Sequence, residues 1–143
     1  MSIKQLSVFA ENKPGAVVEI TDALAKEGID IRAMSIADTQ DYGVLRLIVS
    51  DVNAARDALR EIECIVSVTD VVCVEMSDRP GSLADIIKLL AANDINIEYM
   101  YAFVAVSREH AYTVFRVSNN ERTEDVLSAA GVKVADEEMI KEL

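Results

Sequence analysis

The stretch Asn12–Val17, NKPGAV, returns 66 positions later as DRPGSL over Asp78–Leu83, and this near-repeat decides the fold. Each copy follows an alternating apolar run and precedes apolar residues at helical spacing. A change of period from two to about 3.6 residues is typical of a strand that leads into a helix. A repeat at a fixed offset indicates a duplicated structural unit.

The first half predicts the order strand, helix, strand, strand, helix, strand. Its elements are a strand over Ile3–Phe9, a helix from Val17 that ends at Gly28, strands over Asp30–Asp38 and Val44–Ser50 joined by the turn Thr39–Gly43, a helix that begins at Asp51 with Ala55, Ala58, Leu59 and Ile62 on its apolar side, and a strand over Val66–Thr69. Gly28 stands where a helix C-cap is expected. This order is that of a split βαβ motif.

The second half predicts the same order. Its elements are a strand over Val71–Met76, a helix with its apolar stripe from Leu83 to Leu90, a hairpin of Asn96–Ala105 and Ala111–Ser118, a helix over Thr123–Ala130 and a strand over Val132–Ala135. Identical residues recur at the offset, among them Ile20 with Ile86 and Met34 with Met100. We therefore interpret the chain as two copies of one unit.

The sequence thus predicts an α+β fold of two ferredoxin-like βαββαβ units, each an antiparallel sheet with helices on one face. The predicted domains are residues 1–69 and residues 70–143, the second with a short C-terminal helix after Asp136. Units of this size are marginally stable alone, and no Gly- or Ser-rich linker separates them. We expect them to pack side by side.

The composition excludes several classes of partner. A net charge of −11 disfavours nucleic acids and anionic membrane surfaces. No apolar run approaches the roughly 20 residues of a membrane helix. Cys64 and Cys73 lie in apolar stretches without metal-ligand spacing, so we expect reduced thiols and a cytoplasmic location.

Catalytic groups are few. The single histidine, His110, falls in the predicted second hairpin turn, which leaves no histidine-based triad or multi-histidine metal site. The carboxylates gather at helix starts and on helix faces, where the helix dipole and solvation account for them. No phosphate-binding glycine motif occurs. We expect no enzymatic activity, no cofactor and no metal.

The Pro-Gly steps allow two interpretations. Proline at the first helical position with glycine after it would open the helix N–H groups to a carboxylate or phosphate. Alternatively, each loop is only a tight turn in which Asn12 or Asp78 caps the helix through its side chain. In the first case a zwitterion would place its ammonium against these same side-chain oxygens and nearby carbonyls.

The second hairpin is apolar on both predicted faces. Ile97, Tyr99, Tyr101, Phe103 and Ala105 would share one face, with Met100, Ala102 and Val104 on the other. Either both faces are buried, one by helices and one by a second chain, or Tyr99, Met100 or Tyr101 lines a ligand pocket between units. The two interpretations are compatible.

These features resemble the ACT domain family. NKPGAVVEITDALAKEGIDI and DRPGSLADIIKLLAANDINI each match its pattern of Asn/Asp-x-Pro-Gly, an apolar helix and a following hairpin, so the resemblance covers the whole chain as two copies. It implies a regulatory module that binds small ligands, usually amino acids, between paired units. The implied ligand-binding positions, with the hairpin residues added, are Asn12, Lys13, Gly15, Ala16, Val17, Ile29, Asp30, Ile31, Asp78, Arg79, Gly81, Ser82, Leu83, Ile95, Asn96, Ile97, Tyr99, Met100 and Tyr101.

ACT units usually regulate an attached catalytic domain, and none accompanies them in this sequence. The resemblance therefore implies a homodimer that acts on a separate metabolic enzyme, or an amino-acid sensor or carrier. An alternative expectation is an assembly subunit without a ligand, similar to the small subunit of acetolactate synthase. A ferredoxin-like enzyme is a third class, disfavoured by the missing catalytic groups.

Overall fold

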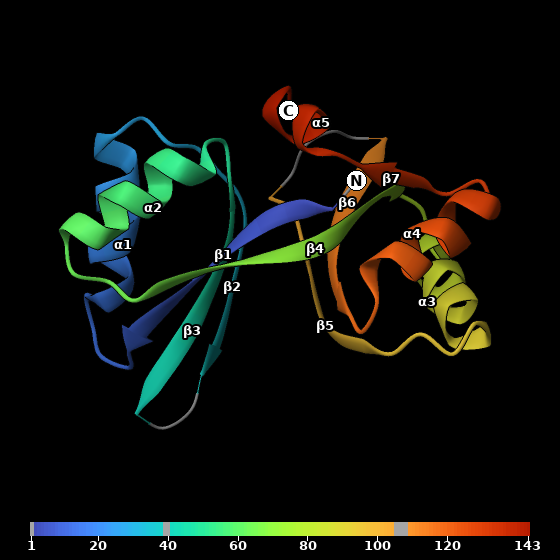
Figure 1. Ribbon diagram of the computed structural model, residues 1–143, viewed down its shortest axis with the longest axis horizontal. Coiled ribbons are helices and arrows are strands. Elements are labelled where there is room, and N and C mark those ends of the chain that lie inside the picture. Colours follow the sequence, from blue (N-terminus) through green and yellow to red (C-terminus); the bar gives the residue numbers. More distant parts are fainter. Residues whose placement is uncertain (1, 39–40, 105–108) are drawn as a thin grey trace. The chain divides into compact units, whose positions relative to one another are not determined.

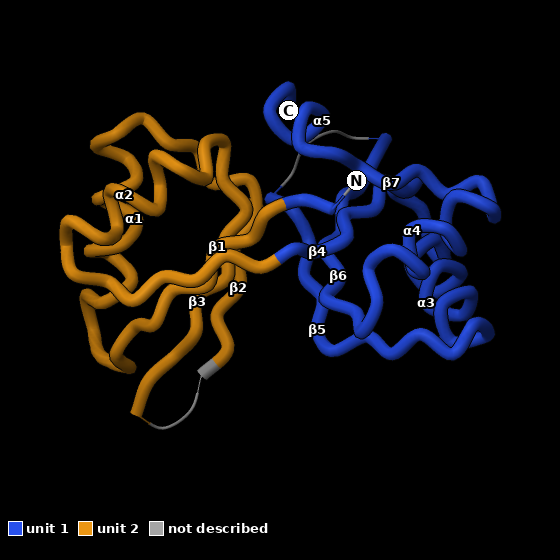
Figure 2. The backbone as a smooth tube through the Cα atoms, viewed as in Figure 1, with its two compact units in different colours: residues 1–3, 70–143 blue, residues 4–69 orange. Residues whose placement is uncertain are grey.

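The computed structural model describes residues 2–38, 41–104 and 109–143 (Figure 1). The chain divides into two compact units (Figure 2). The N-terminal unit comprises residues 4–69, and the C-terminal unit comprises residues 70–143 with residues 1–3. Each unit is described by itself.

The N-terminal unit is a four-stranded sheet in the order β2-β3-β1-β4. Strand β3 pairs antiparallel with both β1 and β2. The elements are β1 (Ile3–Glu11), α1 (Ala16–Lys26), β2 (Ile31–Asp38), β3 (Tyr42–Val49), α2 (Val52–Glu61) and the first residues of β4 (Val66–Ser77). Helices α1 and α2 contact each other and cover one face of this sheet (Figure 1).

The C-terminal unit repeats this arrangement with the strand order β7-β4-β6-β5. Strand β6 pairs antiparallel with both β4 and β5, and β7 pairs antiparallel with β4. Its elements after β4 are α3 (Ser82–Ala92), β5 (Ile97–Ala102), β6 (His110–Val117), α4 (Asn120–Ala129), β7 (Lys133–Ala135) and α5 (Glu137–Lys141). The prediction of two βαββαβ units with antiparallel sheets is confirmed.

None of the described helices is long and apolar enough to cross a membrane.

Each unit has a core of its own beneath its two helices. In the N-terminal unit Ile20 and Leu24 of α1 are buried against the inward side chains of β1 and β3. In the C-terminal unit Ile86 and Leu90 of α3 occupy the equivalent places. Burial of such apolar stripes supplies most of the stability of a short amphipathic helix.

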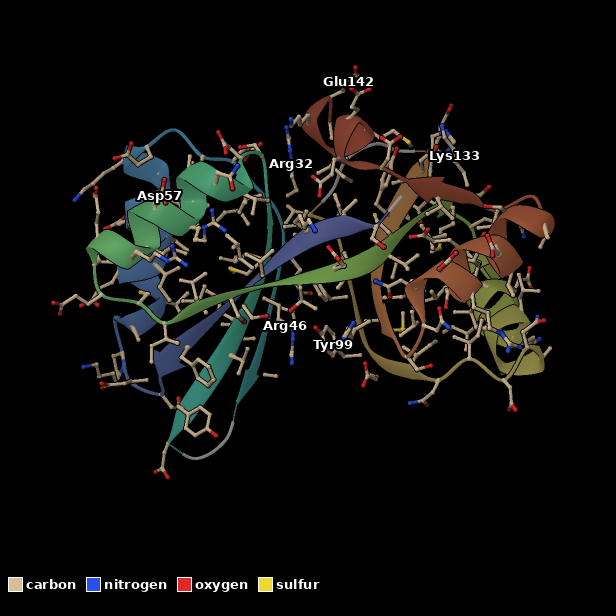
Figure 3. All side chains as sticks on the ribbon, viewed as in Figure 1. Arg32, Arg46, Asp57, Tyr99, Lys133 and Glu142 are labelled. Atoms are coloured by element: carbon tan, nitrogen blue, oxygen red, sulfur yellow. The ribbon has the colours of Figure 1, made fainter. Side chains whose placement is uncertain are left out.

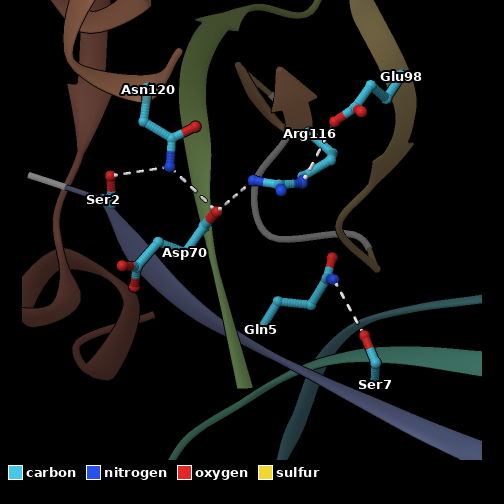
Figure 4. A network of polar contacts seen from close by, with 7 residues as sticks. All are labelled: Ser2, Gln5, Ser7, Asp70, Glu98, Arg116 and Asn120. Carbon is cyan, nitrogen blue, oxygen red and sulfur yellow. Dashed lines mark hydrogen bonds and ion pairs between the residues drawn. The ribbon is translucent and has the colours of Figure 1, made fainter. Parts of the chain in front are cut away.

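Strand β4 differs from the prediction of two strands that meet at Asp70. It runs without a break over 12 residues, because no glycine or proline interrupts it. The Asp70 carbonyl accepts hydrogen bonds from Asn120 Nδ2 at 3.0 Å and Arg116 Nη1 at 3.4 Å (Figure 4). Arg116, on β6, also forms an ion pair with Glu98 on β5, with 3.3 Å between Nε and Oε2. The side chains thus connect the edge strand β5 to its neighbour β6.

The prediction of which residues share a face of the second hairpin is wrong for Ile97. The register between β5 and β6 shifts between Ile97 and Tyr99, so Glu98 is an extra residue. Ile97 therefore packs against the core together with Met100. The predicted member Ala105 lies outside the described residues, as do Thr39 and Gln40 of the first predicted turn.

The two cysteines are free thiols. Cys73 is fully buried on β4, and burial raises the pKa of its thiol to about 12, with the Glu75 charge adding to the shift. The half-buried Cys64 thiol also has a raised pKa because of burial. Neither group is activated as a nucleophile.

Because the folded pKa of Cys73 lies above its unfolded value, the neutral thiol stabilises the fold fully below about pH 8.5. That contribution is expected to fall as the pH rises from about 9 towards 12. Urea unfolding at several pH values should show less alkaline loss for Cys73→Val than for the parent chain. If the free energy of unfolding falls equally steeply with pH in both proteins, the loss does not come from Cys73 and this explanation is wrong.

Candidate functional site at the two Pro-Gly loops

Both Pro-Gly loops end in a left-handed glycine that serves as the helix N-cap. Gly15 has φ of 89° before α1, and Gly81 has φ of 90° before α3. The helices therefore start one residue after the glycine, and the prediction of Pro14 and Pro80 as first helical residues is wrong. Only glycine adopts this conformation without strain, which is why the turn needs it.

The helix starts at these loops have no side-chain cap. The predicted caps from Asn12 and Asp78 are absent, because glycine occupies the cap position of both α1 and α3. In contrast, Asp51 caps α2 by accepting from Ala54 N at 3.1 Å, and Asn119 caps α4 by accepting from Arg122 N at 3.0 Å. The first N–H groups, of Ala16 and Ser82, donate to Lys13 O and Arg79 O at 3.3 Å, and the next two N–H groups of each helix remain donors for a ligand.

The glycines leave open space where a side chain would begin. A Cβ atom at Gly15 or Gly81 would meet nothing within 4 Å. Within each unit the glycine is therefore explained by its positive φ, and no close approach of another group is needed to account for it.

The structure separates the two halves of each predicted site within a unit. Ile29 and Ile95 follow the C-terminal ends of α1 and α3, where their N–H groups bond to Leu24 O and Leu90 O. Helix α3 has 11 residues, which corresponds to about 16 Å. A single amino acid inside one unit cannot reach both ends of the helix.

The positions after the helices are occupied by structural contacts. Ile29 and Ile95 are buried in the two cores, and Ile31 packs against the first. The Asp30 N–H donates to Ser50 Oγ at 2.9 Å, and its carboxylate pairs with Arg32 at 2.8 Å. Asn96 is exposed at the end that precedes β5.

The aromatic residues of β5 stack on each other. The rings of Tyr99 and Tyr101 lie 6.5 Å apart between centroids at an interplanar angle of 20°. Figure 3 labels Tyr99 on β5, which is the edge strand farthest from β7 in the order of this sheet. Met100 points instead to the core.

His110 is the first residue of β6 rather than part of a turn. Its Nδ1 lies 3.3 Å from Glu75 Oε1, and Lys133 Nζ lies 3.2 Å from Glu75 Oε2. Figure 3 shows Lys133 extending from β7. The Glu75 side chain is 12% exposed, so this is a largely buried carboxylate at the centre of a charged cluster.

Each unit has an open cavity beside its Pro-Gly loop, lined by the end of the first strand, the start of the first helix and the connection to the last strand. The N-terminal cavity has a volume of about 300 Å³, and the C-terminal cavity has a volume of about 290 Å³. Their linings correspond at the offset of the repeat: Phe9 with Glu75, Ala10 with Met76, Glu11 with Ser77, Lys13 with Arg79, Ala16 with Ser82, Glu19 with Asp85, and Ile20 with Ile86. The two units thus have a cavity at the same place, with different residues at several corresponding positions.

Sequence reasoning found the loop residues of these cavities and missed the others. Glu75, Ser77 and Asp85 were not among the predicted site residues, because their role depends on the α4–β7 connection approaching the loop. A position-by-position comparison of the two repeats shows that Phe9 in the first copy corresponds to Glu75 in the second. A further groove of about 330 Å³ lies between α1 and α2 of the N-terminal unit and includes none of the predicted residues.

Comparison with known proteins identifies the fold family. The model of the ACT domain pair matches residues 1–143. A Bacteroides thetaiotaomicron protein of known crystal structure has 39% sequence identity to this chain and a TM-score of 0.93. The match covers 100% of this chain and 98% of that one. No curated protein matches the sequence significantly.

Two more distant structures share the fold. The regulatory subunit of aspartate kinase from Thermus thermophilus, in its ligand-free form, is 18% identical with a TM-score of 0.68, over 90% of this chain and 89% of that one. The same subunit from Thermus flavus is 19% identical with a TM-score of 0.58, over 90% of each chain. With a family model that spans every residue and a relative that covers the full length, the chain belongs to the family of ACT domain pairs.

Proposed function

We propose that this chain is a non-enzymatic regulatory protein that binds an amino acid at a Pro-Gly loop and so modulates a separate enzyme of amino-acid metabolism. The observation that carries the proposal is the pair of helices, α1 and α3, that begin at a left-handed glycine without a side-chain cap. The other described helices all have such a cap. Membership in a family of regulatory domains supports the same conclusion.

The chemistry of a helix start suits the carboxylate of an amino acid. Unpaired N–H groups and the positive end of the helix dipole favour an anion at this place. Binding changes activity only if the amino acid prefers one state of the protein over another. We propose that residues 1–69 and 70–143 act as the two ACT domains whose arrangement responds to the ligand.

The partner and setting follow from the same proposal. The Thermus neighbours are regulatory subunits, which supports a role in trans on a separate enzyme. The two free thiols support a cytoplasmic location. Exposed apolar side chains, among them Phe9 at 48% and Tyr42 at 47%, support assembly as a homodimer.

These exposed side chains also favour a second candidate function, an assembly subunit without a ligand. Beyond Phe9 and Tyr42, the N-terminal unit exposes Ile36, Ile62 and Ile65. In that case the loops would only be turns, and the surface would carry the function.

Thermal unfolding of the full chain with each of the twenty amino acids separates the two candidates. An amino acid at 100 times its dissociation constant should stabilise the fold by about 2.7 kcal/mol. We expect one or a few chemically related amino acids to raise the unfolding temperature. If none of them does so at millimolar concentration, the ligand-binding proposal is wrong and the assembly function is favoured.

A further inference from the structure

We infer that the amino acid binds within the C-terminal unit, in the cavity between the start of α3, the end of β4 and the α4–β7 connection, and that the equivalent N-terminal cavity does not bind it. This inference rests on the proposed function and specifies its site and ligand class. All the residues that line this cavity belong to the C-terminal unit.

Ser82 is the strongest indication of a ligand in this cavity. The residue is 7% exposed, yet its Oγ has no hydrogen-bond partner among the described residues. A buried hydroxyl without a partner is destabilising, and such groups in folded proteins often mark a binding role. Staggered rotamers allow the hydroxyl to turn towards a ligand carboxylate at the start of α3.

The cation at the loop differs between the two cavities. Lys13 pairs with Glu11 at 3.0 Å in the N-terminal unit, so its charge is already balanced. In the C-terminal unit Ser77 replaces Glu11, and the Arg79 guanidinium has no partner among the described residues. A guanidinium binds a carboxylate through two parallel hydrogen bonds, which a lysine cannot do.

The opposite wall of the C-terminal cavity is acidic. Glu75 and Asp85 both line it; Lys133 and His110 contact the Glu75 carboxylate, whereas the Asp85 carboxylate has no ion-pair partner among the described residues. An unpaired carboxylate in this wall disfavours a phosphate or a dicarboxylate but suits an ammonium group. Together with Arg79 and Ser82 it favours a zwitterion over a simple anion.

The N-terminal cavity lacks two of these groups and has Lys13 and Glu19 at the positions of Arg79 and Asp85. Phe9 stands in place of Glu75 and contacts Tyr42 with ring centroids 5.8 Å apart. Ala16 stands in place of Ser82 and offers no hydroxyl. The N-terminal cavity is therefore apolar at these two positions, where the C-terminal cavity has a carboxylate and a hydroxyl.

The apolar residues of the cavity limit the side chain of the amino acid. Met76, Ile86 and Val132 form this part of a cavity of about 290 Å³. We therefore expect a small or aliphatic side chain without charge, as in glycine, alanine, serine, threonine or valine.

The location can be tested by NMR titration of the ¹⁵N-labelled full chain with these amino acids and with their carboxamides. At least one of these amino acids should shift the amide signals of Leu83 and Ala84, and the matching carboxamide, which lacks the carboxylate, should not. Shifts at Val17 and Val18 instead would overturn the inference and leave the proposed function intact. No shift with any of these amino acids would overturn the inference, and no shift when the titration is extended to all twenty would overturn the proposed function as well.

Matched variants test the assigned groups. Ser82→Ala and Arg79→Gln should each weaken binding of the amino acid that gives the largest shift by roughly 10- to 100-fold. Ala16→Ser and Lys13→Gln, at the equivalent positions, should leave its affinity unchanged. Ser82→Ala should not lower the unfolding temperature without ligand, since it removes an unpaired hydroxyl. Unchanged affinity in Ser82→Ala and Arg79→Gln would exclude this cavity.

Discussion

Phe115→Ala is expected to lower the free energy of unfolding by about 3–5 kcal/mol, the largest effect of any single change considered. Phe115 lies on the central strand β6, is 0% exposed and belongs to the core of the C-terminal unit. It stands opposite Val72 on β4 and Met100 on β5, so its removal leaves a cavity that two neighbouring strands cannot fill. Urea denaturation of both proteins measures the difference.

An exposed aromatic residue provides the control. Phe9→Ala, at a side chain that is 48% exposed, should cost less than about 1 kcal/mol. A loss below about 1 kcal/mol for Phe115→Ala would mean that the core of this unit is not packed as described.

Gly81→Val should destabilise the fold by about 2 kcal/mol, although the new side chain would meet no neighbour within 4 Å. The cost is conformational: a φ of 90° is strongly disfavoured for a β-branched residue. The loop sequence alone suggests that such a change would be tolerated, because it does not show that glycine occupies the left-handed cap.

Gly81→Asn separates the backbone effect from any effect of side-chain volume. Asparagine adopts the left-handed region far more readily, so its loss of stability should stay below about 1 kcal/mol. Equal losses for valine and asparagine, measured by thermal unfolding, would contradict the conformational explanation.

The repeat made the fold predictable, because apolar spacing and turn residues gave the same order of elements twice. Some local details could not be predicted from the sequence, for identifiable reasons. A β-bulge at Glu98 has no compositional signal, and it turns Ile97 to the core face. His110 joins β6 because its position opposite Ser77 continues the antiparallel ladder.

The candidate site was only partly predictable. Loop residues such as Arg79 and Ser82 follow from the Pro-Gly pattern, whereas Glu75 enters the cavity only through the sheet and the α4–β7 connection. The hydrogen bonding of Ser82 also requires coordinates, because a serine at a helix start usually finds a partner.

The two cavities differ at two corresponding positions. The N-terminal copy has Phe9 and Ala16, and the C-terminal copy has Glu75 and Ser82 at the same places. We propose that the C-terminal copy binds the ligand and that the N-terminal copy, with Phe9 and Tyr42 exposed, supplies surface for assembly.

The most direct test of the central claim is a crystal structure of the full chain soaked with the amino acid that most raises its unfolding temperature. The account predicts one bound molecule per chain, with its carboxylate at Ser82, Arg79 and the first turn of α3 and its ammonium near Asp85 and Glu75. A molecule beside Lys13 and Ala16, or one at neither loop, would contradict it.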